Sequence, residues 1–168
     1  MNAFKQLLGA SGGNPPIGTW ISSASPLVAE AVAHSGFDWG LIDMEHSPVD
    51  LMEVVHLLQA LAATRVAPLV RVPCNDAVMI KRVLDAGATT LMVPAVKDAD
   101  AARAAAASMR YPPEGVRVAS AFGRASRFGT EEVLRILPLL ADPAAKPYWS
   151  HVVLTAGAAG GPGTAEAL

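Results

Sequence analysis

The sequence has a single cysteine, almost no net charge and no long apolar run. Cys74 by itself excludes an intrachain disulfide and a Cys-rich zinc site, and we interpret it as a packing residue. The formal net charge of -2 over 168 residues gives no electrostatic reason to expect nucleic acid or an anionic membrane as a partner. No stretch approaches the roughly 18 apolar residues of a membrane span, and residues 1–10 lack the apolar core of a signal peptide. We therefore expect a cytoplasmic protein.

What is present is a regular alternation of apolar runs and helical patterns. Hydrophobic residues make up 52% of the chain, enough for one domain with a sizeable core. Each run is rich in Val, Ile, Leu or Trp and lacks polar alternation, which is typical of parallel strands buried on both faces. The four predicted strands cover residues 17–21, 39–43, 67–72 and 89–96.

Helix start and stop signals lie between these runs. An N-cap residue, in two cases followed by proline, precedes each helical pattern, and glycine follows two of them. The predicted starts are Ser25-Pro26, Ser47-Pro48 with Asp50 as a capping-box acid, Asn75 and Asp98, and the stops are Gly36 and Gly87.

The order βαβαβαβα predicts a parallel sheet with right-handed crossovers. Either an open doubly wound sheet or part of an eight-stranded barrel satisfies it. A doubly wound nucleotide-binding sheet usually has a glycine-rich turn after its first strand. Residues 22–25 are Ser-Ser-Ala-Ser, without glycine, which favours the barrel.

The pattern changes after Gly129, and we place a boundary between residues 1–129 and a divergent tail, 130–168. The sequence predicts a helix over residues 130–137 and a short strand over residues 151–155, and the Ala/Gly-rich stretch 157–168 is expected to be disordered. The Gly-Ala-Ala-Gly-Gly-Pro-Gly within it resembles a phosphate loop, but no helix of any length follows. We therefore predict no nucleotide site there.

Four residues near the carboxyl ends of predicted strands are candidates for catalysis or binding. They are Trp20, Asp43, His46 and Arg71. Catalytic groups of such barrels lie at this rim, where an imidazole acts as a base and an arginine holds a carboxylate or an oxyanion. The simpler alternatives are a helix cap for Asp43 and His46 and a surface ion pair for Arg71. Glu45 ranks below these four, as a structural or loop-orienting residue.

Four stretches carry a resemblance to a known family. They are residues 36–48 (Gly-Phe-Asp-Trp-Gly-Leu-Ile-Asp-Met-Glu-His-Ser-Pro), 70–73 (Val-Arg-Val-Pro), 85–88 (Asp-Ala-Gly-Ala, with Val93-Pro94 after it) and 110–117 (Arg-Tyr-Pro-Pro-Glu-Gly-Val-Arg). In order and spacing they resemble the N-terminal half of the HpcH/HpaI aldolase family, over about residues 4–129.

The resemblance implies an α/β fold, the (β/α)8 TIM barrel of the phosphoenolpyruvate/pyruvate type, with about the first four βα units here, usually in a hexamer. It implies metal-dependent retro-aldol cleavage of 4-hydroxy-2-oxo acids, among them 2-keto-3-deoxy sugar acids, to pyruvate and an aldehyde. By resemblance, His46 is the base and Asp43 pairs with it, Arg71 binds the keto acid and helps to hold the enolate, and Trp20 lines the pocket.

The resemblance also implies a divalent metal, Mg, Mn or Co, held by a Glu after the fifth strand and an Asp after the sixth. After Gly129 the sequence has no apolar run that ends in an Asp or Glu. Three acids in this part of the chain do not follow a predicted strand; they are Glu131, Glu132 and Asp142. We therefore assign no metal ligand.

A half barrel is expected to leave its first and fourth strands as open edges and its inner apolar face in water. We therefore expect no metal-dependent aldolase activity from this chain alone. The alternatives are a non-catalytic remnant or oligomerisation module and, more weakly, a lyase of the citrate lyase type.

Overall fold

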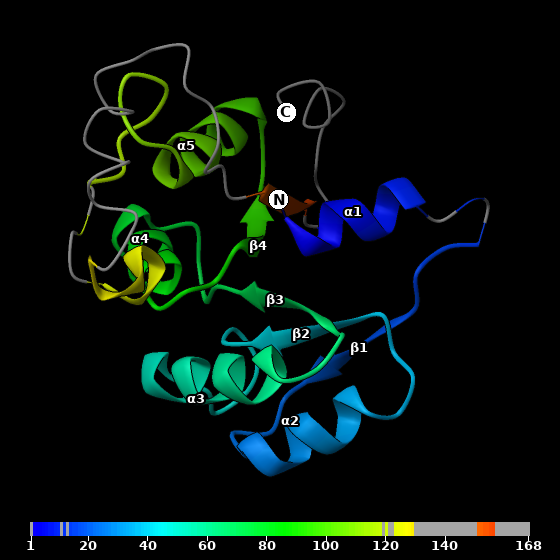
Figure 1. Cartoon of the computed structure of the whole chain (residues 1–168). Helices are drawn as coiled ribbons and strands as arrows, with labels where there is room; N and C mark the ends of the chain where they lie inside the picture. The colour runs from blue at the N-terminus through cyan, green and yellow to red at the C-terminus, as the bar shows by residue number, and fades with distance from the viewer. Residues whose placement is uncertain are drawn as a thin grey trace.

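Strands and helices alternate through most of the chain (Figure 1). The computed structural model describes residues 2–10, 12, 14–118, 120, 123–129 and 151–156. In chain order the elements are α1 (Ala3–Ala10), β1 (Gly18–Ile21), α2 (Pro26–Ala33), β2 (Trp39–Asp43), α3 (Leu51–Ala62), β3 (Ala67–Arg71), α4 (Ala77–Asp85), β4 (Thr90–Val96), α5 (Ala99–Met109), the 3-10 segment η1 (Arg124–Gly129) and β5 (His151–Ala156).

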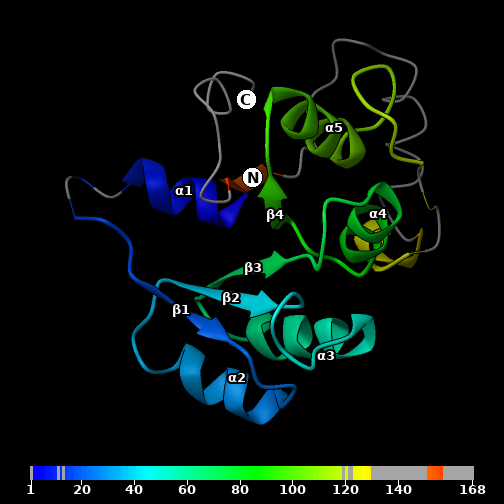
Figure 2. The ribbon, with the colours of Figure 1, turned by 180° about the vertical axis from the view of Figure 1, so that it is seen from behind.

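The sheet has five parallel strands that lie side by side in chain order, β1-β2-β3-β4-β5. A doubly wound sheet reverses its strand order at a switch point, whereas a barrel wall does not. The sequential order therefore confirms the barrel alternative. Figures 1 and 2 show α2, α3, α4 and α5 in an arc outside the curved sheet.

The predicted strand at residues 151–155 is confirmed, and its place in the sheet corrects another expectation. It pairs with β4 as β5, so the described β4 edge is not open. A fifth parallel strand thus does follow the loop near Gly129, but it begins only at His151. Its last residue, Ala156, provides no carboxylate, and the next residue in the sequence is a glycine. The predicted helix at 130–137, the boundary at 129 and the Ala/Gly-rich stretch lie outside the described residues.

The main core lies between the sheet and helices α3, α4 and α5. Alternate strand residues such as Ile42, Val70 and Leu91 are fully buried in it, because successive side chains of a strand point to opposite faces. Each such side chain contributes about 1.5–3 kcal/mol through removal from water. This core keeps β2, β3 and β4 in register and so places their carboxyl ends beside one another.

The opposite face of the sheet is covered where β2 and β3 meet. Leu41 and Leu69, paired across these strands, are 0% and 2% exposed, so the expectation that the inner face would meet water is wrong at these positions. Helix α1, which the sequence did not predict, contacts β3. Its Phe4 packs edge-on against Trp39, and the preceding Asn2 hydrogen-bonds the Thr89 carbonyl at 2.8 Å. Thus α1 lies at the amino ends of the strands.

Two helices begin later than predicted. Helix α3 is capped by Asp50, whose N–H donates to Glu53 at 3.1 Å, because the Ser47 hydroxyl donates instead to the Asp43 carbonyl. Helix α4 is capped by Asp76 rather than Asn75. Among the described helices, none has the length and apolar character needed to cross a bilayer.

Candidate functional site

The candidate site lies at the carboxyl ends of β2 and β3. Asp43 is the last residue of β2, Arg71 is the last residue of β3, and the two are register partners. The ladder extends one step further, since the Met44 N–H donates to the Arg71 carbonyl at 3.0 Å. Parallel register therefore places a carboxylate and a guanidinium from distant segments side by side at the rim.

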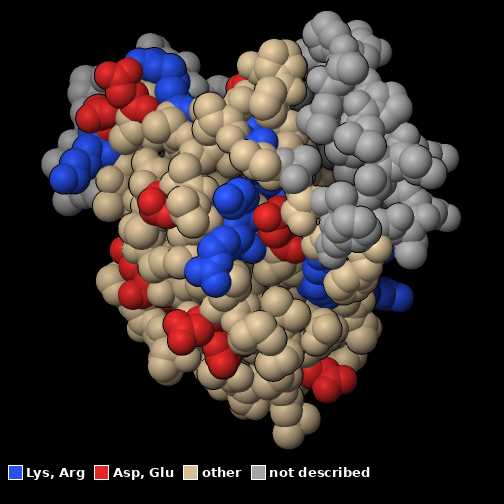
Figure 3. Space-filling model, turned by 90° about the vertical axis from the view of Figure 1, so that its left-hand side faces the viewer, with Lys and Arg blue, Asp and Glu red and all other residues tan. Residues whose placement is uncertain are grey.

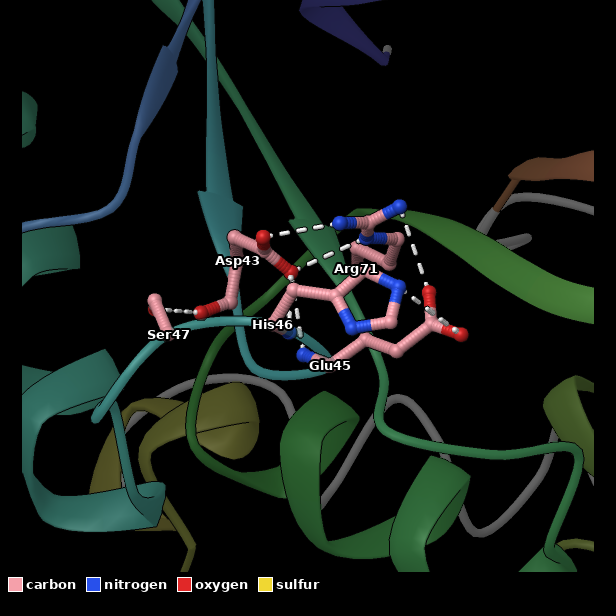
Figure 4. A network of polar contacts seen from close by, with 5 residues as sticks. All are labelled: Asp43, Glu45, His46, Ser47 and Arg71. Atoms are coloured by element: carbon pink, nitrogen blue, oxygen red, sulfur yellow. Dashed lines mark hydrogen bonds and ion pairs between the residues drawn. The ribbon is translucent and has the colours of Figure 1, made fainter.

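Asp43 and Arg71 form a bidentate ion pair. Arg71 donates from Nε to Oδ1 at 2.9 Å and from Nη2 to Oδ2 at 2.7 Å, as Figure 4 shows. The same Oδ1 accepts the backbone N–H groups of Glu45 at 2.9 Å and His46 at 3.3 Å. The planar fork of arginine matches a carboxylate in this way, so both groups are fixed in orientation.

The electrostatics of this pair favour its charged form. Burial is the largest single influence on Asp43 and opposes ionisation, but the Arg71 hydrogen bond, the two backbone N–H groups and the Arg71 charge together lower the pKa of Asp43 below its ordinary value. The hydrogen bond to Asp43 raises the pKa of Arg71 above its ordinary value. Asp43 is therefore an ionised anchor for the guanidinium.

Trp20 of β1 covers one face of this guanidinium. The Arg71 Cζ atom lies 4.3 Å from the Trp20 ring centroid, within the range of a cation–π contact. Trp20 is 47% exposed, so its ring forms an apolar wall beside the charged groups. The structure thus brings together the predicted Trp20, Asp43 and Arg71.

Glu45 connects Arg71 with His46. One Glu45 oxygen lies 3.2 Å from Arg71 Nη1, and the other lies 3.7 Å from His46 Nε2 (Figure 4). Asp43 contacts only the backbone N–H of His46, so the predicted side-chain pair of Asp43 with His46 is not the one observed. Asp43 is directed at Arg71 by strand register, and the imidazole, 69% exposed, turns outward to Glu45.

Sequence reasoning ranked Glu45 too low as a member of the site. A usable signal was its position two residues beyond a strand end, beside a strand that ends in arginine. The interpretation of Cys74 as a packing residue is wrong, because Cys74 is exposed. It lies in the loop after β3, outside the covered core.

The described residues do not provide a metal site. No cluster of three or more His, Cys, Asp or Glu suited to a metal occurs among them. Asp43 directs both carboxylate oxygens to Arg71, and Glu45 divides its oxygens between Arg71 and His46. A divalent ion at this rim would have to displace the guanidinium, so the donor set fits an anion beside Arg71 better than a cation.

The rim face carries both signs of charge. The arrows of β2 and β3 point to the left in Figure 1, and Figure 3 looks onto that side of the molecule. In Figure 3, basic and acidic side chains meet near the middle of this face, and the described residues on it form no broad patch of a single sign. Local pairing, rather than a long-range field, therefore governs what an anionic ligand meets here.

Comparison with known proteins identifies the family of this chain. The sequence model of the HpcH/HpaI aldolase/citrate lyase family matches residues 16–145. The chain is 51% identical over 115 residues to 2-dehydro-3,6-dideoxy-6-sulfogluconate aldolase of Pseudomonas putida, covering 68% of this chain and 45% of that protein. It is 52% identical over 128 residues to 4-hydroxy-2-oxo-heptane-1,7-dioate aldolase of Salmonella arizonae, covering 76% of this chain and 48% of that protein.

A solved structure agrees over most of the chain. The crystal structure of an HpcH/HpaI aldolase/citrate lyase family protein from Burkholderia cenocepacia matches with a TM-score of 0.76 and 37% identity, covering 92% of this chain and 59% of that one. The chain spans about half the length of the curated relatives that it matches.

Proposed function

Because this chain belongs to the HpcH/HpaI aldolase/citrate lyase family, we propose that its rim site serves carbon–carbon bond cleavage in 4-hydroxy-2-oxo acids, 2-keto-3-deoxy sugar acids among them. The products would be pyruvate and an aldehyde. The described fold corresponds to the N-terminal portion of the family's TIM barrel. The family description also covers citrate lyases, but the aldolase names of relatives near 50% identity favour aldol chemistry.

The observation that carries this proposal is the anchored guanidinium. Asp43 fixes two nitrogens of Arg71, and Trp20 covers one of its faces. The Nη1 edge, which Glu45 contacts at 3.2 Å, therefore has a defined direction. A 2-oxo acid presents a carboxylate and an adjacent oxo oxygen, both of which accept hydrogen bonds from such an edge. The same cation would stabilise negative charge that develops on the oxo oxygen during cleavage.

The proposed reaction assigns one role to each side chain. His46 takes the proton of the C4 hydroxyl, C4 becomes the aldehyde carbonyl carbon, and the electron pair of the C3–C4 bond passes to the pyruvate enolate. Arg71 stabilises the enolate oxygen, and Asp43 keeps Arg71 in place. A proton returned to C3 completes pyruvate.

The divalent metal implied by the family has no fitting ligand set among the described residues, so no step is assigned to it. We therefore propose that the chain by itself lacks metal-dependent aldolase activity. The test is an assay of the purified chain with Mg, Mn or Co. Sustained, metal-dependent release of pyruvate would contradict this proposal.

Pyruvate binding tests the site itself. We expect calorimetry to detect pyruvate binding, and we expect Arg71→Lys to weaken it about tenfold or more, because lysine loses the directed fork. Arg103→Lys is the matched control, since Arg103 forms an exposed ion pair on α5 and should leave binding unchanged. No binding by the unaltered chain would favour the alternative of a non-catalytic remnant or oligomerisation module.

The remaining parts of the proposal concern partners and location. Its small-molecule partners would be a keto acid and an aldehyde, and its location the cytoplasm. We propose a homo-oligomer, a hexamer by resemblance. Light scattering of the purified chain measures this directly, and a monomer at all concentrations would contradict it.

A further inference from the structure

The guanidinium of Arg71 carries a carboxylate at each of its three nitrogens. Nε and Nη2 are bound by Asp43, and Nη1 lies 3.2 Å from a Glu45 oxygen. The Nη1 edge is the one that the proposed function assigns to the 2-oxo acid. In the described site, therefore, a side-chain carboxylate already occupies the position that a substrate carboxylate would use.

The contact of Glu45 with Arg71 affects the binding of an anionic ligand through its charge. Asp43 and Glu45 contribute two negative charges against the single positive charge of Arg71, so the trio has a formal charge of -1. A 2-oxo acid brings a further negative charge. Carboxylates that share one guanidinium repel each other, and a partly buried site screens this repulsion poorly. Binding of the acid is favourable only if one side-chain carboxylate gives up its contact.

Geometry identifies Glu45 as the exchangeable carboxylate. Asp43 makes the shorter contacts, at 2.7 and 2.9 Å, and also accepts two backbone N–H groups, with its side chain only 5% exposed. Glu45 makes one longer contact with Arg71, and its side chain is 21% exposed. Its other oxygen already lies 3.7 Å from His46, which offers a second partner once Arg71 is released.

We propose that Glu45 is a specificity-determining residue that occupies Nη1 of Arg71 in the empty site and yields it to the carboxylate of a 2-oxo acid. The displaced carboxylate remains beside His46 and orients the imidazole, so binding of the acid and positioning of the base are linked. A neutral carbonyl compound offers Arg71 a weaker hydrogen bond than a carboxylate does, so it displaces Glu45 less readily than a 2-oxo acid. This inference rests on the proposed function.

The test compares Glu45→Gln with the unaltered chain in calorimetric titrations with pyruvate and with the dianion oxalate. Glutamine keeps the size of the side chain but removes the competing charge. We expect Glu45→Gln to bind pyruvate about fivefold more tightly, because the change removes the repulsion between the partly exposed Glu45 carboxylate and the acid. The affinity for oxalate, which carries two negative charges, should increase by a larger factor. The gain should shrink at high salt because screening weakens the repulsion. Glu45→Ala should shift the affinity in the same direction.

Glu53→Gln is the matched control, because it removes one negative charge from the first turn of α3 without touching Arg71. We expect no change in its affinity for either acid. If the unaltered chain binds pyruvate and Glu45→Gln binds it equally or more weakly, this inference alone is overturned. Weaker binding is the result expected of a glutamate that only supports the structure of the site. Absence of binding by every variant would overturn the proposed function and this inference together.

Discussion

Replacing Asp43 with asparagine removes the charge that anchors Arg71 while keeping the shape of the side chain. The asparagine oxygen can still accept the backbone N–H groups, but its amide then faces the Nη2 group of Arg71. A hydrogen bond to a charged group contributes about 1.5–3 kcal/mol, and breaking a fully buried pair costs about 3–5 kcal/mol. Because Arg71 remains 15% exposed, we expect Asp43→Asn to reduce the free energy of unfolding by about 2–3 kcal/mol.

The effect should depend on pH in a defined direction. The folded-state pKa of Asp43 lies below its ordinary value of 3.8, so its stabilisation is present above that pH and is lost as the pH falls through the folded-state pKa. The difference between the unaltered chain and Asp43→Asn should therefore be constant at neutral pH and shrink in acid, where Asp43 becomes protonated.

The assay is urea denaturation, with the midpoint and slope of each transition measured at neutral and acidic pH. Asp100→Asn is the control, because the Asp100–Arg103 pair is largely exposed and should change stability by no more than about 0.5 kcal/mol. If Asp43→Asn were as mild as this control, the carboxylate would not be the anchor of the guanidinium, and the account of the site would be refuted.

Three further changes test the fold. Gly18→Ala should lower the free energy of unfolding, measured by urea denaturation, by about 1–3 kcal/mol, because the added Cβ would lie 1.9 Å from Trp39. Gly9→Ala is the control, since its Cβ meets nothing within 4 Å and the change should be neutral or stabilising. Equal effects of the two changes would contradict this packing. Asp98→Ala should cost about 1 kcal/mol by removing the N-cap of α5, and a smaller loss for Asp98→Asn would support the cap. Burial raises the pKa of Tyr111 above 10.0, so its contribution to stability is present below that pH and is lost as the pH rises through the folded-state pKa. Absorbance titration should show a phenolate transition above pH 10.0 that Tyr111→Phe removes, and an ordinary transition would contradict the burial.

Local sequence patterns predicted most of the architecture. Buried strands and helices were recognisable because hydrophobic periodicity and capping residues act over a few neighbouring positions. The absence of glycine after the first strand favoured the barrel, and the sequential strand order confirmed it. Helix α1 was not predicted, and its place against the sheet depends on the contact of its Phe4 with Trp39, which no local pattern encodes.

The sequence predicted most residues of the candidate site but not the contacts between their side chains. By themselves, the strand patterns predicted that Asp43 and Arg71 lie near the carboxyl ends of successive strands, and four short stretches, among them the one around His46, carried the family resemblance. Only the tertiary structure decided that Arg71 binds Asp43 and Glu45, that Trp20 covers the guanidinium, and that His46 turns outward. Asp43 and Arg71 are 28 positions apart, and contacts over such a separation depend on strand register and side-chain rotamers, which no local pattern encodes.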